Sequence, residues 1–576
     1  MSAPLSPESS RARSSAFFGQ RGTPAGFTAR AFTRAMGFTG DDMRKPVVGI
    51  AQTWSEFNNC HQHFKGLAEA VKRGVWQEGG LPLEFPTISL GEVHTDPTTM
   101  LFRNLMAMDT EEMIRAQPMD SVVLLAGCDK TTPAALMGAA SANIPAILVS
   151  GGPMLNGRYQ GKDLGACTDC GRYTAELRAG TITPDSYGEI EDAICRSAGS
   201  CMVMGTASTM ASMAEALGMA LPHNAAIPAP DSRRLQLAEL SGRQAVRLAQ
   251  SGLRPSDIMT AAAFDNAIRV LAAIGGSTNA VIHLVAIAGR LAIPLPLDRF
   301  DAISRTTPWL VNLKPSGAFQ MEELFDAGGL PAVMKELAPL LNGDPVTVTG
   351  RTVGEHLAEF RPARDRNVVA PLAAPFGAEG GIAILRGNLC PDGAVVKQTA
   401  ASPALATHRG RAVVFTSVDD LRARIDDAEL DVGAEDVLVL QNAGPVGAPG
   451  MPEAGFMPIP RKLLERGVRD MVRISDARMS GTSYGTIVLH MAPESAVGGL
   501  LALVRNGDTI ALDLPRRRLT LEVPEEELAR RRAAWQPPAR QFERGYRALY
   551  QEHVLQAPEG CDFDFLRPRP GAIIGS

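Results

Sequence analysis

The sequence predicts an α/β protein, with an N-terminal α/β domain built on a parallel sheet and a C-terminal β-rich domain. Apolar, strand-like runs alternate with longer helical patterns through the first two-thirds of the chain. One β-α-β unit is complete: strand Ser121–Gly127, helix Thr132–Asn143 and strand Ala146–Ser150. After about Pro371 the segments become short, glycine-bounded and rich in β-formers, which marks the second domain.

The N-terminal elements follow the hydrophobic pattern in chain order. Val47–Ala51 is a short apolar strand ahead of the β-α-β unit. After this unit, apolar residues at helical spacing predict four helices, and residues 276–279 supply N-cap residues for the last one. The four helices are Ser208–Leu217, Leu235–Ser251, Asp265–Gly275 and Ala280–Leu291.

The C-terminal domain is predicted from short strands between glycine-rich turns. These strands are Gly381–Leu385, Ala394–Val396, Ala412–Phe415, Val437–Leu440 and Thr486–Leu489. A charged stretch, Pro524–Tyr550, predicts a return to helix. We therefore divide the chain into a flexible tail at 1–22, an N-terminal domain at 23–385 and a C-terminal domain at 386–576.

Composition excludes several classes of function. The 576 residues carry 57 Lys+Arg and 62 Asp+Glu, a formal net charge of −5, which gives no electrostatic footprint for nucleic acid. No apolar run reaches the ~18 residues of a membrane helix. Residues 1–22 lack the apolar core of a secretory signal, and eight cysteines are too few for a disulfide scaffold. We expect a cytoplasmic location, free cysteines and neither nucleic-acid nor membrane partners.

The strongest local constellation is Cys128-Asp129-Lys130, which directly follows the strand Ser121–Gly127. Ligands bind at the carboxyl ends of strands in open α/β sheets, and this end carries a thiol, a carboxylate and an amine. The N-terminus of the next helix would favour a thiolate at Cys128. Iron or zinc would suit the sulfur and Mg²⁺ the carboxylate. A buried cysteine beside a surface ion pair explains the same pattern.

The other cysteines give weaker signals. Cys60 and Cys201 lie in loops that converge with Cys128 only if distant strand ends meet, which spacing does not establish. The one CxxC pair joins Cys167 and Cys170. A zinc site needs a second pair, and a thioredoxin-like motif should open a helix after a strand, whereas this pair follows a glycine-rich loop. We expect Cys167 and Cys170 to be structural or incidental.

Three residues with side-chain oxygens are further candidates. Glu92 follows the apolar segment 87–90, and Glu453 ends a Gly/Pro-rich loop where a carboxylate could ligate a cation. An ordinary solvated carboxylate is the simpler explanation of each. Ser480 lies on a small-residue loop, but it lacks the G-x-S-x-G pattern and an evident His/Asp pair, so a hydrolase triad is disfavoured.

Together these motifs resemble the IlvD/Edd dehydratase family. Cys128-Asp129-Lys130-Thr131-Thr132-Pro133-Ala134 resembles the family's first signature, and Asp476-Ala477-Arg478-Met479-Ser480-Gly481-Thr482 resembles the second. Further matches are Gly275–Ala280, Lys314–Gly317, Pro391–Lys397 and Gly444–Glu453, and the resemblance covers about residues 45–515. Three segments resemble the sugar-acid (aldonate) branch more than the branched-chain dihydroxy-acid enzymes: Cys60–Phe64, Cys201–Met210 and Ser483–Thr486.

The resemblance implies a hydro-lyase that converts an aldonate, such as L-arabinonate, D-xylonate or D-gluconate, to its 2-keto-3-deoxy acid. The C2 proton is abstracted and the C3 hydroxide is lost. The implied cofactors are a 2Fe–2S cluster, with 4Fe–4S as the alternative, and Mg²⁺. The implied cluster ligands are Cys60, Cys128 and Cys201, and the implied Mg²⁺ ligands are Glu92, Asp129, Glu453 and a carbamylated Lys130. Ser480 and Lys130 are the implied catalytic residues, with Ser480 as the base. The family also implies a barrel-like C-terminal domain and a homodimer or homotetramer.

Other functions remain open. The same chemistry on the dihydroxy acid of branched-chain amino-acid synthesis would be distinguished by a substrate panel. A non-catalytic Fe–S redox protein would need neither the carboxylates nor Ser480. A zinc hydrolase would contain zinc and show no visible colour.

Overall fold

The computed structural model describes residues 13–568, and its N-terminal sheet has four parallel strands in the order β2-β1-β3-β4. The strands are β1 (Val47–Gln52), β2 (Leu81–Pro86), β3 (Ser121–Leu125) and β4 (Ala146–Val149). β1, β3 and β4 are buried along their whole length, as expected for parallel strands covered on both faces. Helix α5 (Thr131–Ala142) joins β3 to β4 and confirms the predicted β-α-β unit.

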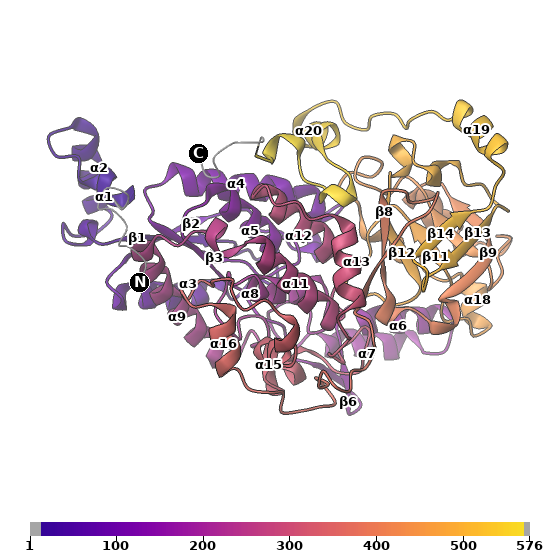
Figure 1. Ribbon diagram of the computed structural model, residues 1–576, viewed down its shortest axis with the longest axis horizontal. Helices are drawn as coiled ribbons and strands as arrows, with labels where there is room; N and C mark the ends of the chain where they lie inside the picture. The colour runs from indigo at the N-terminus through magenta and orange to yellow at the C-terminus, as the bar shows by residue number, and fades with distance from the viewer. Residues whose placement is uncertain (1–12, 569–576) are drawn as a thin grey trace.

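Helices cover both faces of this sheet (Figure 1). α3 (Phe64–Gln77) and α9 (Ser232–Ser251) pack together against β1 and β3 on one face. α4 (Arg103–Ala116) and α5 pack together on the other. Glycine permits the close α3–α9 contact, because a Cβ at Gly74 would lie 1.9 Å from the Glu239 carbonyl oxygen.

A second layer of helices lies against α5. It contains α8 (Thr206–Ala216), α11 (Ala261–Ala273), α12 (Asn279–Arg290) and α13 (Leu297–Arg305). The four helices predicted between residues 208 and 291 are confirmed as α8, α9, α11 and α12, with ends shifted by a few residues. The remaining elements of this half are β5 (Gly157–Tyr159), β6 (Lys162–Leu164), α6 (Thr168–Arg178), α7 (Pro184–Ile194), α10 (Pro255–Ile258), α14 (Met321–Asp326), α15 (Gly329–Glu336) and α16 (Val353–Glu359).

The C-terminal sheet has eight strands in the order β14-β13-β9-β10-β11-β12-β8-β7. They are β7 (Ile382–Leu385), β8 (Gly393–Lys397), β9 (Thr407–Phe415), β10 (Val437–Leu440), β11 (Arg473–Ser475), β12 (Ile487–Ala492), β13 (Thr509–Asp513) and β14 (Arg518–Leu521). The four central strands are parallel and the outer pairings are antiparallel. All five predicted strands are confirmed; β11, β13 and β14 were not predicted.

This sheet is nearly closed into a barrel, as the family resemblance implied. A bridge between Arg386 and Arg518 links the ends of the two edge strands, β7 and β14. Both faces of this sheet are buried. Side chains alternate along β10, so Val437 and Val439 enter one apolar core while Leu438 and Leu440 enter another. Short helices α17 (Val418–Arg424) and α18 (Arg461–Glu465) lie between the parallel strands in sequence.

The C-terminal segment corrects one prediction. The charged stretch Pro524–Tyr550 is not one helix but two, α19 (Glu525–Ala534) and α20 (Gly545–His553). Pro537 and Pro538 stand between them, and proline lacks the N–H that a helix interior requires. α20 and the residues after it pack against the N-terminal half, where Arg290 forms a fully buried ion pair with Asp562 at 2.6 Å.

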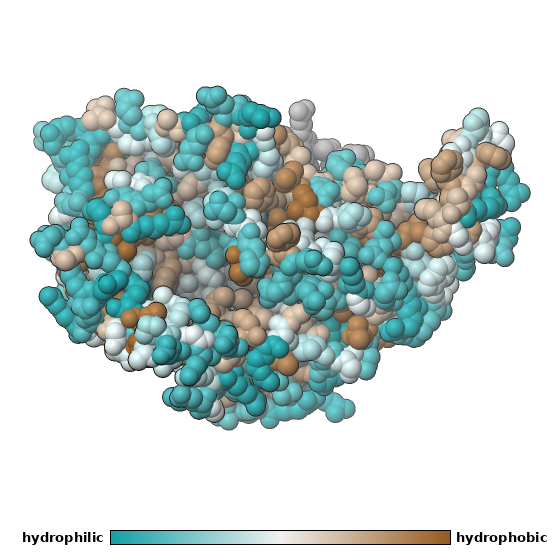
Figure 2. Space-filling view, turned by 180° about the vertical axis from the view of Figure 1, so that it is seen from behind, coloured by the Kyte–Doolittle hydropathy of each residue, from teal (hydrophilic) through white to brown (hydrophobic). Residues whose placement is uncertain are grey.

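The N-terminal end forms an arm of two helices, α1 (Arg13–Phe18) and α2 (Pro24–Ala35), which projects from the body (Figures 1 and 2). Of the predicted tail at 1–22, residues 1–12 lie outside the described part, whereas α1 is helical and its Ser14 bonds Asp120. Apolar side chains of α2 are exposed on the arm, with Phe27 and Phe32 each 70% exposed. No helix between residues 13 and 568 has the length and apolar character to cross a membrane.

Candidate functional site

Three loops with candidate residues leave the carboxyl edge of the N-terminal sheet. Cys60 lies in the loop after β1, Glu92 in the turn after β2, and Cys128 directly after β3. Parallel strands end at the same edge, so their order brings these loops together.

His61 joins the first and third loops. Its ring is fully buried and neutral, because burial lowers its pKa to about 3. Nδ1 bonds the Thr53 carbonyl oxygen at 2.8 Å, and Nε2 accepts hydrogen bonds from the backbone N–H groups of Gly127 and Cys128, each at 3.1 Å. The sequence prediction gave His61 no role, but the structure shows that it fixes the backbone of the Cys128 loop.

Cys60 and Cys128 are brought into contact. Their side chains share a hydrogen bond, and this bond together with burial raises the pKa of Cys128 well above its ordinary value. The raised pKa of Cys128 is opposite in direction to the thiolate that we expected, because the hydrogen bond to Cys60 and burial both favour the protonated thiol. A metal ion takes the place of such protons when it binds thiols.

Hydrogen bonds hold the loop that carries Cys201 beside the Cys60 loop. Asn59 and Gly199 exchange hydrogen bonds at 3.1 Å, which ties the Cys60 loop to the Cys201 loop. Gly199 has φ +128°, and a Cβ there would lie 2.8 Å from the Met154 nitrogen. Sγ of Cys201 lies 3.6 Å from Sγ of Cys167.

The CxxC pair is not incidental. The pair opens a helix, since Cys167 is the N-cap of α6, and the short strand β6 precedes it. We had expected only a glycine-rich loop before the pair. Thr168, inside the pair, donates a hydrogen bond to the Thr482 carbonyl oxygen at 2.8 Å. The start of α6 therefore contacts both the Cys201 thiol and the loop that carries Ser480.

Three carboxylates surround the buried amine of Lys130. Its Nζ lies 3.6 Å from Oε2 of Glu92 and 3.5 Å from Oε1 of Glu453, and it donates a short hydrogen bond to Asp129. The structure thus gathers all four predicted Mg²⁺ ligands, although Glu453 comes from the C-terminal half. Among residues 13–568, no group of three or more His, Cys, Asp or Glu side chains is preassembled to hold a metal ion.

Charge controls protonation in this cluster. Burial alone would lower the pKa of Lys130, but the neighbouring carboxylates, above all Asp129, raise it overall. Burial would raise the pKa of Glu92, yet the positive charges of Lys130 and Arg478 lower it overall. For Glu453, burial prevails over those two cations, and its pKa is raised. Lys130 is therefore a cation here, whereas carbamylation requires a neutral amine.

Arg478 and Asn279 complete the cluster from two directions. The guanidinium of Arg478 is fully buried and donates to Glu453 Oε1 at 2.9 Å and to Thr98 Oγ1 at 3.1 Å. Nδ2 of Asn279, the first residue of α12, lies 3.1 Å from Glu453 Oε1 and 3.1 Å from the Met479 carbonyl oxygen. One amide thus links the carboxylate cluster to the residue before Ser480.

Ser480 lies on a tightly packed loop beside this cluster. Its Oγ bonds Thr482 Oγ1 at 2.8 Å. A Cβ on Gly481 would lie 2.6 Å from the Thr206 nitrogen, so only glycine fits against the start of α8. Nζ of the fully buried Lys397 donates to the Gly481 carbonyl oxygen at 3.3 Å, and burial lowers the pKa of this amine to about 7.

Sequence reasoning missed roles for four residues: His61, Asn279, Arg478 and Lys397. Each stands inside a segment that we matched to the family, and that membership was the available signal. All four side chains are buried, and buried polar groups usually have fixed partners.

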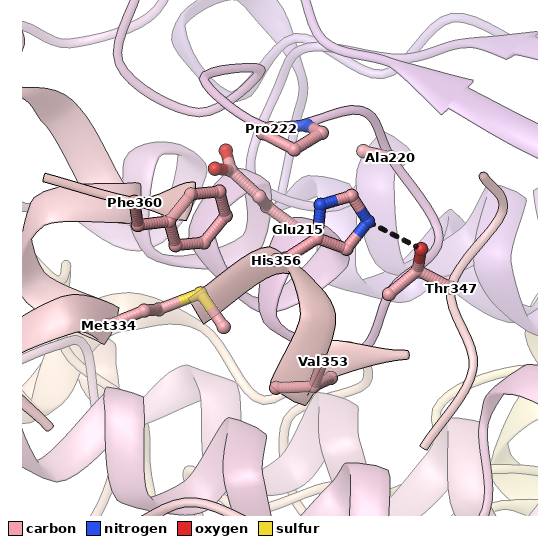
Figure 3. A pocket seen from close by; sticks show the side chains of 8 residues that line it. All are labelled: Glu215, Ala220, Pro222, Met334, Thr347, Val353, His356 and Phe360. Atoms are coloured by element: carbon pink, nitrogen blue, oxygen red, sulfur yellow. Dashed lines mark hydrogen bonds between the residues drawn. The ribbon is translucent and has the colours of Figure 1, made fainter. Parts of the chain in front are cut away.

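A small cavity lies away from this cluster, at the other end of α8 (Figure 3). Glu215, His356 and Phe360 are among its lining residues, and the dashed line marks the bond from His356 to Thr347. Its volume of about 20 Å³ suits a single water molecule rather than an organic substrate. Burial raises the pKa of Glu215 to about 7.

Comparison with protein families covers most of the chain. The family model for the N-terminal part of dihydroxy-acid/6-phosphogluconate dehydratases matches residues 45–356. The model for the C-terminal part matches residues 367–561.

Three curated relatives are similar over nearly their whole length. The chain is 54% identical to L-arabonate dehydratase of Azospirillum brasilense, over 98% of each chain. It is 54% identical to L-arabinonate dehydratase of Rhizobium leguminosarum bv. trifolii, over 92% of each chain. It is 51% identical to 6-deoxy-6-sulfo-D-gluconate dehydratase of Pseudomonas putida, over 91% of each chain.

Proposed function

Because the chain belongs to the dihydroxy-acid/6-phosphogluconate dehydratase family, it is a hydro-lyase, and we propose that its substrate is a sugar acid of the aldonate class. The product would be the 2-keto-3-deoxy acid. The observation that carries the proposal is the buried cluster of Glu92, Asp129 and Glu453 around Lys130, next to the loop of Ser480.

The polar lining around the cluster supports a sugar acid over a branched-chain acid. Asn279, Thr206 and Ser277 form a hydrogen-bonded group, and Thr482 bonds Ser480. Oδ1 of Asn279 is buried and has no hydrogen-bond partner within residues 13–568. An unmet buried acceptor costs about 1–3 kcal/mol, so a substrate hydroxyl that donates to it would bind favourably. An alkyl branch would leave this acceptor unpaired.

The residues present fit the two cofactors that the family resemblance implies. Carboxylate oxygens are the ligands that Mg²⁺ prefers, and Glu92, Asp129 and Glu453 would hold it, with Lys130 joining them once carbamylated. Thiolates are the usual ligands of Fe–S clusters, and Cys60, Cys128 and Cys201 would supply them from three joined loops. Bound there, the two groups would supply Lewis-acid stabilisation of the substrate's oxygen atoms.

The chain's own residues then have distinct tasks. Arg478 keeps Glu453 in place and adds a positive charge near the site where an enolate-like charge develops. Asn279 sets the distance between Glu453 and the Ser480 loop through one amide. Arg478 and Asn279 are therefore positioning residues, since each already binds its partners in the folded chain.

Ser480 would take the C2 proton of the aldonate. Ser480 is partly exposed, and its hydroxyl neighbour is Thr482. A serine hydroxyl is a weak base unless nearby positive charge stabilises its alkoxide. As the C2 proton moves to the Ser480 alkoxide, the C3–O bond breaks and hydroxide leaves. The proton now on Ser480 then converts the hydroxide to water and restores the alkoxide. The resulting enol becomes the 2-keto acid by tautomerisation.

The test begins with anaerobic purification and measurement of iron, sulfide and magnesium. A 2-keto-acid assay then compares L-arabinonate, D-xylonate, D-gluconate and the branched-chain dihydroxy acid. We expect Fe–S absorbance and the highest kcat/KM on an aldonate. Preference for the branched-chain acid would refute the substrate class. Reversible redox behaviour without any dehydration would favour the electron-transfer alternative.

A further inference from the structure

Three cysteines outside the proposed ligand set gather beside Cys201. Cys167 Sγ lies 3.6 Å from Cys201 Sγ, and its side chain also bonds that of Cys170. The backbone N–H of Cys167 donates to the Cys170 sulfur at 3.2 Å. Cys195, at the end of α7, is close enough for its charge to affect Cys167. The proposed dehydration uses none of the three.

The geometry places Cys167 between two possible sulfur partners. A disulfide bond is about 2.05 Å long, so thiols in contact need to approach by only ~1.5 Å to form one. Cys167 touches Cys201 on one side and Cys170, one turn into α6, on the other. Cys167 has φ +69°, a left-handed conformation that is rare for a residue with a side chain and common at functional positions.

Access to solvent agrees with a reactive role. Cys167 is exposed, and Cys170 and Cys201 are partly exposed, whereas Cys390 and Cys561 are buried. Oxidation of cysteine follows exposure, so a diffusible oxidant would reach these three sulfurs, as it would the exposed Cys195 and the partly exposed Cys60.

We propose that Cys167 and Cys170 form a thiol–disulfide relay that returns oxidised Cys201 to its thiol. This inference rests on the proposed function in one respect, the assignment of Cys201 as a cluster ligand. A ligand thiol that loses its iron becomes open to peroxide, and its irreversible oxidation would end the protein's capacity to rebind a cluster.

The chemistry of the relay balances with peroxide as the oxidant. Hydrogen peroxide converts the Cys201 thiol to a sulfenic acid and leaves as water. The Cys167 thiolate attacks that sulfur, the S–O bond breaks, and a second water leaves as the Cys167–Cys201 disulfide forms. The Cys170 thiolate then attacks Cys167, and Cys201 departs as a thiolate. The sulfurs have lost two electrons to peroxide, and this oxidation now resides in a Cys167–Cys170 disulfide, which an external thiol reduces.

The experiment traps the intermediate Cys167–Cys201 disulfide by removing Cys170, the second nucleophile. Full-length wild type and the variants Cys167→Ser, Cys170→Ser and Cys195→Ser are purified anaerobically, and their iron content is measured. Each is exposed to limiting hydrogen peroxide, its free thiols are alkylated, and its disulfides are mapped by mass spectrometry without reduction. Samples are finally reduced and reconstituted with iron and sulfide, and the visible absorbance is read.

The relay predicts which oxidation products each protein should contain after exposure to peroxide. Wild type should contain the Cys167–Cys170 disulfide with Cys201 alkylated, and Cys170→Ser should accumulate the Cys167–Cys201 disulfide. Cys167→Ser should carry sulfinic or sulfonic acid at Cys201 and lose most of its capacity to regain absorbance. Cys195→Ser, which changes the other exposed cysteine, should behave like wild type.

Two results would overturn the relay. One is equal oxidation of Cys201 in wild type and Cys167→Ser. The other is a loss of iron from untreated Cys167→Ser, which would make Cys167 a cluster ligand. The proposed function fails separately, if untreated wild type has no iron or no dehydratase activity, because the disulfide map requires neither.

Discussion

Lys397 offers a prediction whose size follows from burial alone. This lysine ends β8, is 1% exposed and donates one hydrogen bond, to the Gly481 carbonyl oxygen. Burial lowers the pKa of its amine from an ordinary 10.5 to about 7. The perturbation is Lys397→Met, which keeps an unbranched side chain of similar length and removes the titrating group.

The sign and size come from proton linkage. Between about pH 7 and 10.5 the unfolded chain binds a proton at Lys397 that the folded chain releases, so stability rises with pH across this window. The whole shift corresponds to about 5 kcal/mol, and the step from about pH 7 to 9 to about 2 kcal/mol. The variant lacks this gain, while its losses in packing and hydrogen bonding do not depend on pH.

Thermal unfolding of the full chain at one scan rate measures the effect. Between about pH 7 and 9, the wild-type midpoint should rise relative to that of Lys397→Met by about 2 °C for a chain of this length. Lys162→Met, at an exposed position of β6, is the matched control and should follow the wild type. If the gap between wild type and Lys397→Met stays constant with pH, Lys397 is not titrating near neutrality and the reasoning from burial is wrong.

Four further predictions concern the site. Ser480→Ala should lower kcat by about 10²–10⁴-fold with unchanged visible absorbance, and near-normal turnover would remove Ser480 as the base. Cys128→Ser should lose iron and visible absorbance together in metal analysis; retained iron would exclude Cys128 as a ligand. In native mass spectra, bicarbonate with Mg²⁺ should add one CO₂ to wild type but not to Lys130→Arg, because a divalent cation displaces the ammonium from its carboxylates. Asn279→Ala should weaken Mg²⁺ binding by about 10–100-fold in a titration of activity, and equal affinity would show that the amide does not position Glu453.

The sequence predicted the N-terminal sheet well because its signals are local. A buried parallel strand is a continuous apolar run, so β1, β3 and β4 were found with nearly correct ends. The short strand β11 escaped notice, because three residues carry too little pattern. The charged stretch after Pro524 was overextended, since its helical composition hid the effect of Pro537 and Pro538.

The candidate site likewise has parts that local sequence predicts and parts that it does not. Cys128, Asp129 and Lys130 follow a recognisable strand, so their location at the sheet edge could be predicted from the residues themselves. The approach of Glu453 to Lys130 could not, because it depends on how the two halves pack. The contact between Cys167 and Cys201 is of the same kind, since it is set by where α6 begins relative to a distant loop.

The cluster at Lys130 carries more negative than positive charge, and this excess bears on its purpose. Glu92, Asp129 and Glu453 face two cations, Lys130 and Arg478. In a buried region, ionising a carboxylate that has no cation to balance it is unfavourable. The raised pKa of Glu453 reflects this, because it means that the carboxyl group tends to keep its proton. A structural ion network of this size would be expected to balance its charges. A site with one carboxylate to spare is instead suited to accept a divalent cation, which would stabilise all three anions and free the Lys130 amine for reaction with CO₂.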